Sequence, residues 1–271
     1  MAALVVVGLF VLLAVLAPWI EPANPNVGNV ANSLVGPSAG HLLGTDELGR
    51  DVFSRIVDGS KIAIVVAFVS VAIALLVGVA VGVIAGYVGG FVDTVLTRSQ
   101  DVLFAFPTLL LAIIIVAVLG PGLFNAVLAI AIVYIPRFAR LARSTTLQVK
   151  TSEYLDAARL AGVSPLTILL RHVVPNVLPS VVVLAALSMS TAQLAYASLA
   201  FLGLGVSPPQ ADWGSMLSEA RNFITVAPWM VLCPTVALVA LMLAFNVLGD
   251  AIRDVLDPRS DGAKGAPVPS V

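Results

Sequence analysis

Charged residues are scarce in this sequence. Asp, Glu, Lys and Arg make up only 11% of its 271 residues, whereas 59% are hydrophobic. An ordinary soluble domain is about one quarter charged. The composition therefore excludes a soluble globular domain and indicates an integral protein of the lipid bilayer. The net charge of -1, without a basic patch interleaved with aromatic residues, gives no indication of a nucleic-acid partner.

Residues that support enzyme chemistry are also few. Cys233 is the only cysteine, so no disulfide framework forms within the chain. No G-x-x-x-x-G-K-[ST] loop occurs, and the chain therefore lacks the usual phosphate cradle for ATP. A G-x-S-x-G match at residues 36–40 lies in a loop rich in Pro, Asn and Gly, so we interpret it as chance. We predict no catalytic residue, metal site or cofactor on this chain.

Long apolar runs dominate what is present. About 20 apolar residues are needed to cross the hydrocarbon of a bilayer. Strand-length alternation is absent, so the runs are predicted to be helices. The predicted fold class is all-α, a polytopic membrane protein with six transmembrane helices. The six runs are Ala2–Trp19, which we interpret as an uncleaved helix, Ile62–Ala85, Val95–Leu119, Leu123–Ala142, Val173–Leu202 and Val226–Leu248.

Basic residues predict the orientation of these helices. Ten of the fourteen Lys and Arg residues fall on one side, and the positive-inside rule makes that side cytoplasmic. Both termini are then cytoplasmic, and the loops Ile20–Lys61 and Gly203–Thr225 face outward. His41 and His172 lie on opposite faces and cannot share a metal. The ten residues are Arg98, Arg137, Arg140, Arg143, Lys150, Arg159, Arg171, Arg253, Arg259 and Lys264.

The predicted spans carry packing marks but no ionisable residue near their centres. Arg98, Asp101 and Asp250 fall near span ends, which argues against a proton-coupled or ion-coupled carrier. Pro107 and Pro136 are expected to kink their helices, because proline removes a backbone donor. A stripe of small residues, expected to allow close helix packing, comprises Gly78, Gly82, Gly86 and Gly90.

The segment Thr151–Pro179 interrupts the apolar pattern between the fourth and fifth spans. Tyr154, Ala157, Ala158 and Ala161 recur at helical spacing, giving a narrow face that fits another protein's groove. An amphipathic helix on the membrane surface is the alternative, but larger apolar groups are expected there. The predicted structure is two helices joined by a tight turn. Glu153 and Asp156 suit the N-terminal end of the first helix, and Gly162 suits the connection. Ser164 and Pro165 suit the start of the second helix.

This segment resembles the EAA loop of permease subunits of bacterial ABC importers. The similarity rests on residues 156–158 with sequence DAA, Gly162, residues 175–176 with sequence PN, and Pro179. In that family the loop forms a coupling helix that rests in a cleft of the cytoplasmic ATPase. The resemblance implies an ATPase-coupling role for Glu153, Tyr154, Asp156, Ala157, Ala158, Gly162 and Pro165.

Three further segments are similar to the C-type permeases of dipeptide, oligopeptide and nickel importers. They are residues 43–51, LGTDELGRD, residues 201–209, FLGLGVSPP, and residues 256–259, LDPR. With the loop they extend over most of the chain. The resemblance implies a first helix and outer loop over residues 1–61, a five-helix permease core over residues 62–259 that contains the coupling loop 151–179, and a disordered cytoplasmic tail over residues 260–271.

The resemblance also implies partners in a bacterial inner membrane. A homologous B-type permease would share the path, beneath an extracytoplasmic solute-binding protein. Two ATPase subunits or domains would hold ATP and Mg on the cytoplasmic side. Dipeptides or oligopeptides are the expected substrates, with nickel complexes or another small solute as the alternative. A stand-alone six-helix carrier or intramembrane enzyme is the alternative of a different class.

Charged residues in the first outer loop recur at helical spacings. The expected ion pairs join Asp46 to Arg50 and Asp51 to Arg55. One interpretation is a solvated helical face. The other is a contact site for the binding protein, formed by Asp46, Glu47, Arg50 and Asp51.

Overall fold

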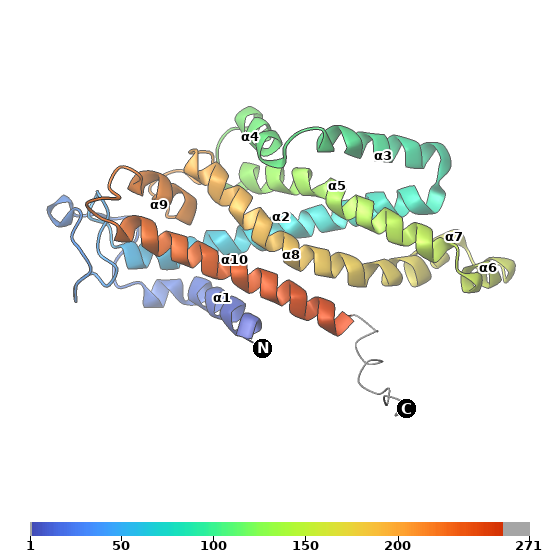
Figure 1. Cartoon of the computed structure of the whole chain (residues 1–271), viewed down its shortest axis with the longest axis horizontal. Coiled ribbons are helices and arrows are strands. Elements are labelled where there is room, and N and C mark those ends of the chain that lie inside the picture. The colour runs from blue at the N-terminus through green and yellow to red at the C-terminus, as the bar shows by residue number, and fades with distance from the viewer. Residues whose placement is uncertain (1, 257–271) are drawn as a thin grey trace, which may run out of the picture.

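The computed structural model describes residues 2–256, and every regular element in that range is helical apart from one isolated β-bridge. Figure 1 shows an elongated bundle of long helices, with a short helical segment at one end and looped segments at the other. The elements are α1 Ala2–Ile20, η1 Val30–Asn32, α2 Val52–Val88, α3 Gly90–Phe104, α4 Thr108–Leu119, α5 Leu123–Lys150, α6 Glu153–Leu160, α7 Pro165–Ile168, a π-helical turn η2 Leu169–Val173, α8 Val174–Phe201, α9 Trp213–Ala220 and α10 Trp229–Leu256.

The all-helical prediction is confirmed for these residues, but the count of six spans is not. Four helical segments are long and apolar enough to cross a membrane: α2, α5, the continuous segment Pro165–Phe201 and α10. The apolar part of α1 is shorter, covering Val5–Ile20. The sidedness of the termini stays a prediction. The last similar segment beyond Leu256 and the predicted tail lie outside the described residues.

The third predicted span, Val95–Leu119, is wrong as a single straight helix. α3 and α4 meet at a 92° bend, so they count as one span only if the pair is taken as broken. Residues 105–107 separate the two helices. The ring of Pro107 prevents a helix from continuing through the turn before it. A proline expected to kink a helix instead separates two helices.

The tightest packing in the bundle joins α2 and α5, which run side by side in Figure 1. A Cβ atom at Gly78 would lie 2.6 Å from Cβ of Phe138, and one at Gly82 would overlap the carbonyl oxygen of Ala139. Gly86 faces Thr146 in the same way. Three glycines of the predicted stripe therefore let the two backbones approach closely.

Gly90 is not part of this contact, which corrects the predicted stripe. It is the first residue of α3 and has φ +57°, and a Cβ atom added to it would meet no other atom within 4 Å. The preceding Gly89 ends α2 with φ +74°, and the chain reverses there. The glycines keep their four-residue spacing beyond the end of α2, so spacing alone does not reveal that the chain reverses at Gly89.

Candidate functional site

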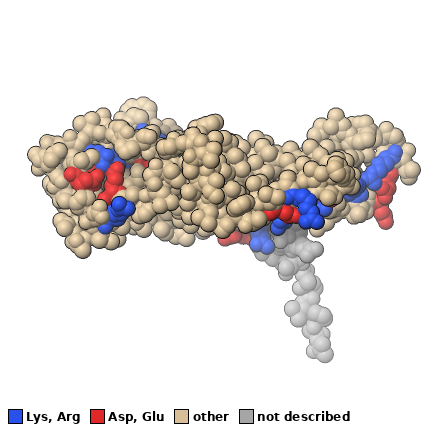
Figure 2. All heavy atoms as spheres, turned by 90° about the horizontal axis from the view of Figure 1, so that it is seen from above, with Lys and Arg blue, Asp and Glu red and all other residues tan. Residues whose placement is uncertain are grey.

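The chain displays two polar ends separated by apolar surface. On the face in Figure 2, charged side chains gather at one end and again beyond a broad uncharged band. The α6–α7 segment lies at one extreme of the bundle, whereas α9 and the loop before α2 lie at the other (Figure 1). Each end contains residues that the sequence singled out.

The α6–α7 segment is a helix, a tight turn and a second short helix. Gly162 has φ +78°, a conformation that glycine adopts without steric cost. The amide of Val163 donates to the carbonyl of Ala158 at 3.1 Å, which closes the end of α6. Ser164 then caps α7, its hydroxyl accepting from the amide of Thr167 at 3.3 Å, with Pro165 in the first turn.

Two buried side chains, Leu155 of α6 and Ile168 of α7, fix this segment to the bundle. The Leu155 side chain is fully buried, and Ala158 is half-buried against the same core. Tyr154 stays 47% exposed, and its ring centroid lies 6.1 Å from that of His172. The Tyr154 hydroxyl also accepts a hydrogen bond from the amide of Asn176 at 3.4 Å. These contacts hold α6 against the start of α8.

The outward side of α6–α7 combines small, charged and apolar groups. Glu153, Asp156 and Ala157 are exposed, and Asp156 pairs with Arg159. Leu160 is 90% exposed and Leu166 is 64% exposed, so large apolar groups are presented next to the predicted alanine face. The sequence interpretation missed these two leucines. The sequence alone does not distinguish them from Leu155 and Ile168 of the same segment, which are buried.

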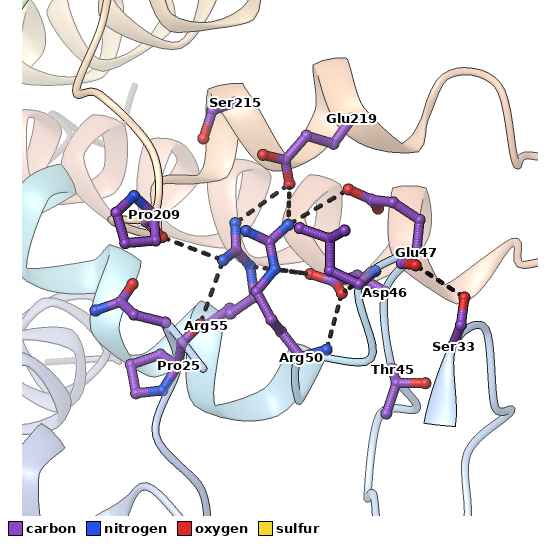
Figure 3. A network of polar contacts seen from close by, with 12 residues as sticks. Pro25, Ser33, Thr45, Asp46, Glu47, Arg50, Arg55, Pro209, Ser215 and Glu219 are labelled. Atoms are coloured by element: carbon purple, nitrogen blue, oxygen red, sulfur yellow. Dashed lines mark hydrogen bonds and ion pairs between the residues drawn. The ribbon is translucent and has the colours of Figure 1, made fainter. Parts of the chain in front are cut away.

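The opposite end contains a buried network of charged side chains, drawn in Figure 3. The Arg50 guanidinium lies 2.8 Å from a carboxylate oxygen of Glu219, and its Nε also pairs with Asp46. Arg55 lies 3.3 Å from the same Glu219 oxygen and 3.5 Å from Asp46. It also donates to the carbonyl oxygens of Pro25 and Pro209. The network joins the loop before α2 to α9.

The predicted pairing of this cluster is partly wrong. Asp46 does pair with Arg50, but Asp51 does not pair with Arg55. Asp51 instead caps α2, its carboxylate accepting from the amide of Ser54 at 2.8 Å, and it lies 3.0 Å from Nδ1 of His41. Arg55 pairs with Glu219, which is distant in sequence, instead of with Asp51, the partner expected from local spacing.

Burial also corrects the interpretation of this cluster as a solvated helical face. Asp46, Arg50, Asp51 and Arg55 are each at most 4% exposed, and residues 44–51 form turns rather than a helix. Of the four residues suggested as a binding-protein contact, only Glu47 is partly exposed. Burial raises the pKa of the Glu47 carboxyl. These buried side chains therefore fit a role in holding the loop before α2 against α9 better than a role as a contact surface for another protein.

Another acidic residue, Asp212, stabilises the start of α9 at the same end of the bundle. The Asp212 side chain accepts from the amides of Gly214 and Ser215 and so caps α9. Burial raises the pKa of this carboxyl above its usual range. Trp213 follows directly, is 2% exposed, and donates from its indole nitrogen to the carbonyl of Ile56 at 3.0 Å. Trp213 therefore packs inside the protein rather than at a membrane interface.

Together, these features define an all-helical membrane protein with a helix–turn–helix projecting from one end of its bundle. A family model for the binding-protein-dependent transport system inner membrane component matches residues 78–262. The chain belongs to this family, and it is an inner-membrane protein. The family consists of ABC transporter permease subunits rather than enzymes.

Curated relatives cover nearly the whole chain. The dipeptide transport system permease protein DppC of Alkalihalophilus pseudofirmus is 44% identical over 94% of this chain and 84% of its own length. The glutathione transport system permease protein GsiD of Shigella flexneri is 46% identical over 97% of this chain and 87% of its own length. These relatives confirm the predicted family resemblance.

A solved structure shows the same fold. A chain of the MetNI methionine ABC transporter, in inward-facing conformations, matches with a TM-score of 0.63. The match covers 75% of this chain and 96% of that chain at 19% identity. At this identity the likeness supports the arrangement of the helices only.

Proposed function

We propose that this chain is the permease subunit through which an ATP-driven importer takes up dipeptides or oligopeptides. Two relatives of at least 44% identity are named for dipeptide and glutathione transport, and glutathione is itself a small peptide. The alternative of nickel complexes or another small solute rests on the broader family resemblance alone. The peptide proposal is therefore the better supported one.

The observation that carries the mechanism is the projecting α6–α7 segment. Its outward groups, Tyr154, Ala157, Leu160 and Leu166, form an exposed and largely apolar surface at the end of the bundle. Such a surface suits the groove of a partner protein. We assign this partner as the ATPase, which holds ATP and Mg, with two copies or domains per transporter. Leu155 transmits movements of the segment to the bundle.

The proposed cycle is a two-state mechanism. ATP-driven closure of the ATPases moves α6–α7, and the contacts of this segment with the bundle change which side of the path is open. A homologous permease completes the path, and an extracytoplasmic solute-binding protein delivers the peptide. This chain provides mechanical coupling and part of the path, while ATP hydrolysis takes place on the partner subunits.

Reconstitution tests this proposal. The chain is co-expressed with a partner permease, ATPases and binding protein from the same organism, and the complex is placed in liposomes. We expect uptake of a radiolabelled dipeptide that requires both ATP and the binding protein. Uptake by this chain alone, or ATP-dependent uptake of a nickel complex but of no peptide, would contradict the proposal.

A further inference from the structure

Arg137 is a cation on a membrane-crossing helix that has no carboxylate partner among residues 2–256. It lies on α5, half-buried, with its guanidinium 4.6 Å from the ring centroid of Tyr134. The Tyr134 ring is itself only 2% exposed. The other arginines of this part of α5 are compensated: Arg140 pairs with Asp101, and Arg143 pairs with Asp93.

The packing of α5 against α2 places Arg137 within the membrane thickness. A Cβ atom at Gly78 would contact Ile135 and Phe138, which flank Arg137. Lys61 is the last charged residue before the apolar run of α2, and Gly78 follows it by about 25 Å of helix at 1.5 Å per residue. The hydrocarbon is about 30 Å thick. Arginines at such a depth face protein or water, or extend toward the membrane interface. The half-buried Arg137 side chain lies over the buried Tyr134 ring and so faces protein.

The break between α3 and α4 lies next to this position. Arg140, three residues further along α5, has its guanidinium 4.1 Å from the ring centroid of Phe104, the last residue of α3. The three following residues, 105–107, are exposed and form no regular helix. Irregular backbone at membrane depth is tolerated where it is buried in protein or lines a water-filled cavity. Discontinuous helices of this kind form substrate sites in other transporters.

We propose that Arg137 binds the carboxylate of a peptide as it passes along the path beside the α3–α4 break. A guanidinium matches a carboxylate with two parallel hydrogen bonds. The proposal rests on the proposed import of peptides, which carry a C-terminal carboxylate. A carboxylate of the partner permease is the other group that Arg137 would accept, and the experiments below separate the two.

Thiol labelling tests whether Arg137 faces an aqueous path. In the complete transporter, Cys233 is replaced by Ser and the variant Arg137→Cys is treated from the cytoplasmic side with a charged, membrane-impermeant thiol reagent. We expect labelling, whereas the same reagent leaves Val236→Cys, on the exposed apolar side of α10, unmodified. Absence of labelling at position 137 places this residue against protein or lipid and overturns the proposal. This readout does not depend on which solute is carried.

Transport kinetics test the carboxylate contact itself. We expect Arg137→Gln to raise the KM for a dipeptide with a free C-terminus at least tenfold, and to leave uptake of the same peptide with an amidated C-terminus unchanged. Arg137→Lys retains a positive charge and should show a smaller effect. Arg253→Gln, at an exposed site near the end of α10, should change neither uptake.

The outcomes remain distinguishable from those of the import proposal. Equal losses for both peptides in Arg137→Gln indicate a structural role and overturn the carboxylate contact, while peptide import stands. Loss of the partner permease from purified Arg137→Gln, with retention in Arg137→Lys, assigns Arg137 to the interface and also overturns it. If the unaltered transporter carries no peptide, the import proposal fails, and the labelling result still decides whether Arg137 lines the path.

Discussion

Arg55 holds a guanidinium at a position where only 1% of its side chain is exposed. Removing a charge of this kind from water is costly unless hydrogen bonds and opposite charges replace the lost hydration. Here two carboxylates and two backbone carbonyls surround it, from the loop before α2, from the segment near Pro209 and from α9. Arg55 therefore connects parts of the chain that are distant in sequence.

Replacing Arg55 by Leu should destabilise the end of the protein opposite α6–α7. The change leaves Asp46 and Glu219 with Arg50 as their only remaining cationic partner among the described residues. Breaking a buried ion pair in this way costs roughly 3–5 kcal/mol. We expect a lower thermal unfolding midpoint of the purified protein in detergent. Adding Glu219→Gln should restore part of the loss, and a double variant no more stable than the single one would contradict this account.

At the scale of elements, the sequence predicted the features that depend on local pattern. The helix–turn–helix of residues 153–168 follows from a glycine, a serine cap and a proline in fixed order, and the structure has it. The α3–α4 break and the partner of Arg55 were not predicted. A proline is compatible with either a kink or a break, and Glu219 lies 164 residues away from Arg55. Both outcomes depend on tertiary packing, which local spacing does not contain.

The contact between α2 and α5 should be sensitive to any side chain at Gly82. In Gly82→Leu the new Cβ would overlap the carbonyl of Ala139, so the two helices must separate. Overpacking of this kind costs about 1–3 kcal/mol. We expect a lower thermal midpoint and a smaller monodisperse fraction in size-exclusion chromatography. Gly8→Leu is the matched control, because the Cβ at Gly8 meets nothing within 4 Å; equal loss in both variants would contradict close packing at Gly82.

The turn between α6 and α7 should tolerate a β-branched residue poorly. Gly162 has a positive φ that valine adopts only under strain, of order 1–3 kcal/mol. The site is open, so Gly162→Val should reorient α6 without disturbing the bundle. We expect reduced ATP-driven uptake at equal membrane levels of protein. Gly40→Val, also in open space but without a positive φ, should transport normally, and unchanged uptake in Gly162→Val would count against a coupling role for the turn.

At the scale of the whole molecule, the two ends have different chemical character. The end around α9 is held by buried charges around Arg50 and Arg55, which pair with Glu219 of α9. The α6–α7 end is fixed by the buried side chains of Leu155 and Ile168, and it presents Leu160 and Leu166 to the outside. The stretch between them is the α2–α5 contact, which runs through three glycines. Under the proposed coupling role, movement of the projecting end would pass along these close-packed helices, because tightly packed interiors transmit strain.

Leu160→Glu should separate docking from folding. Leu160 is 90% exposed, so a charged side chain there costs the isolated protein little, but it would be buried unpaired in an apolar groove of the ATPase. We therefore expect unchanged membrane insertion and unchanged association with the partner permease, together with at least tenfold weaker co-purification of the ATPases. Leu42→Glu, at a 59% exposed site in the loop before α2, is the matched control and should retain them. Full ATPase retention by Leu160→Glu would move the docking surface away from this end of α6, because the introduced charge could not then be buried against the partner.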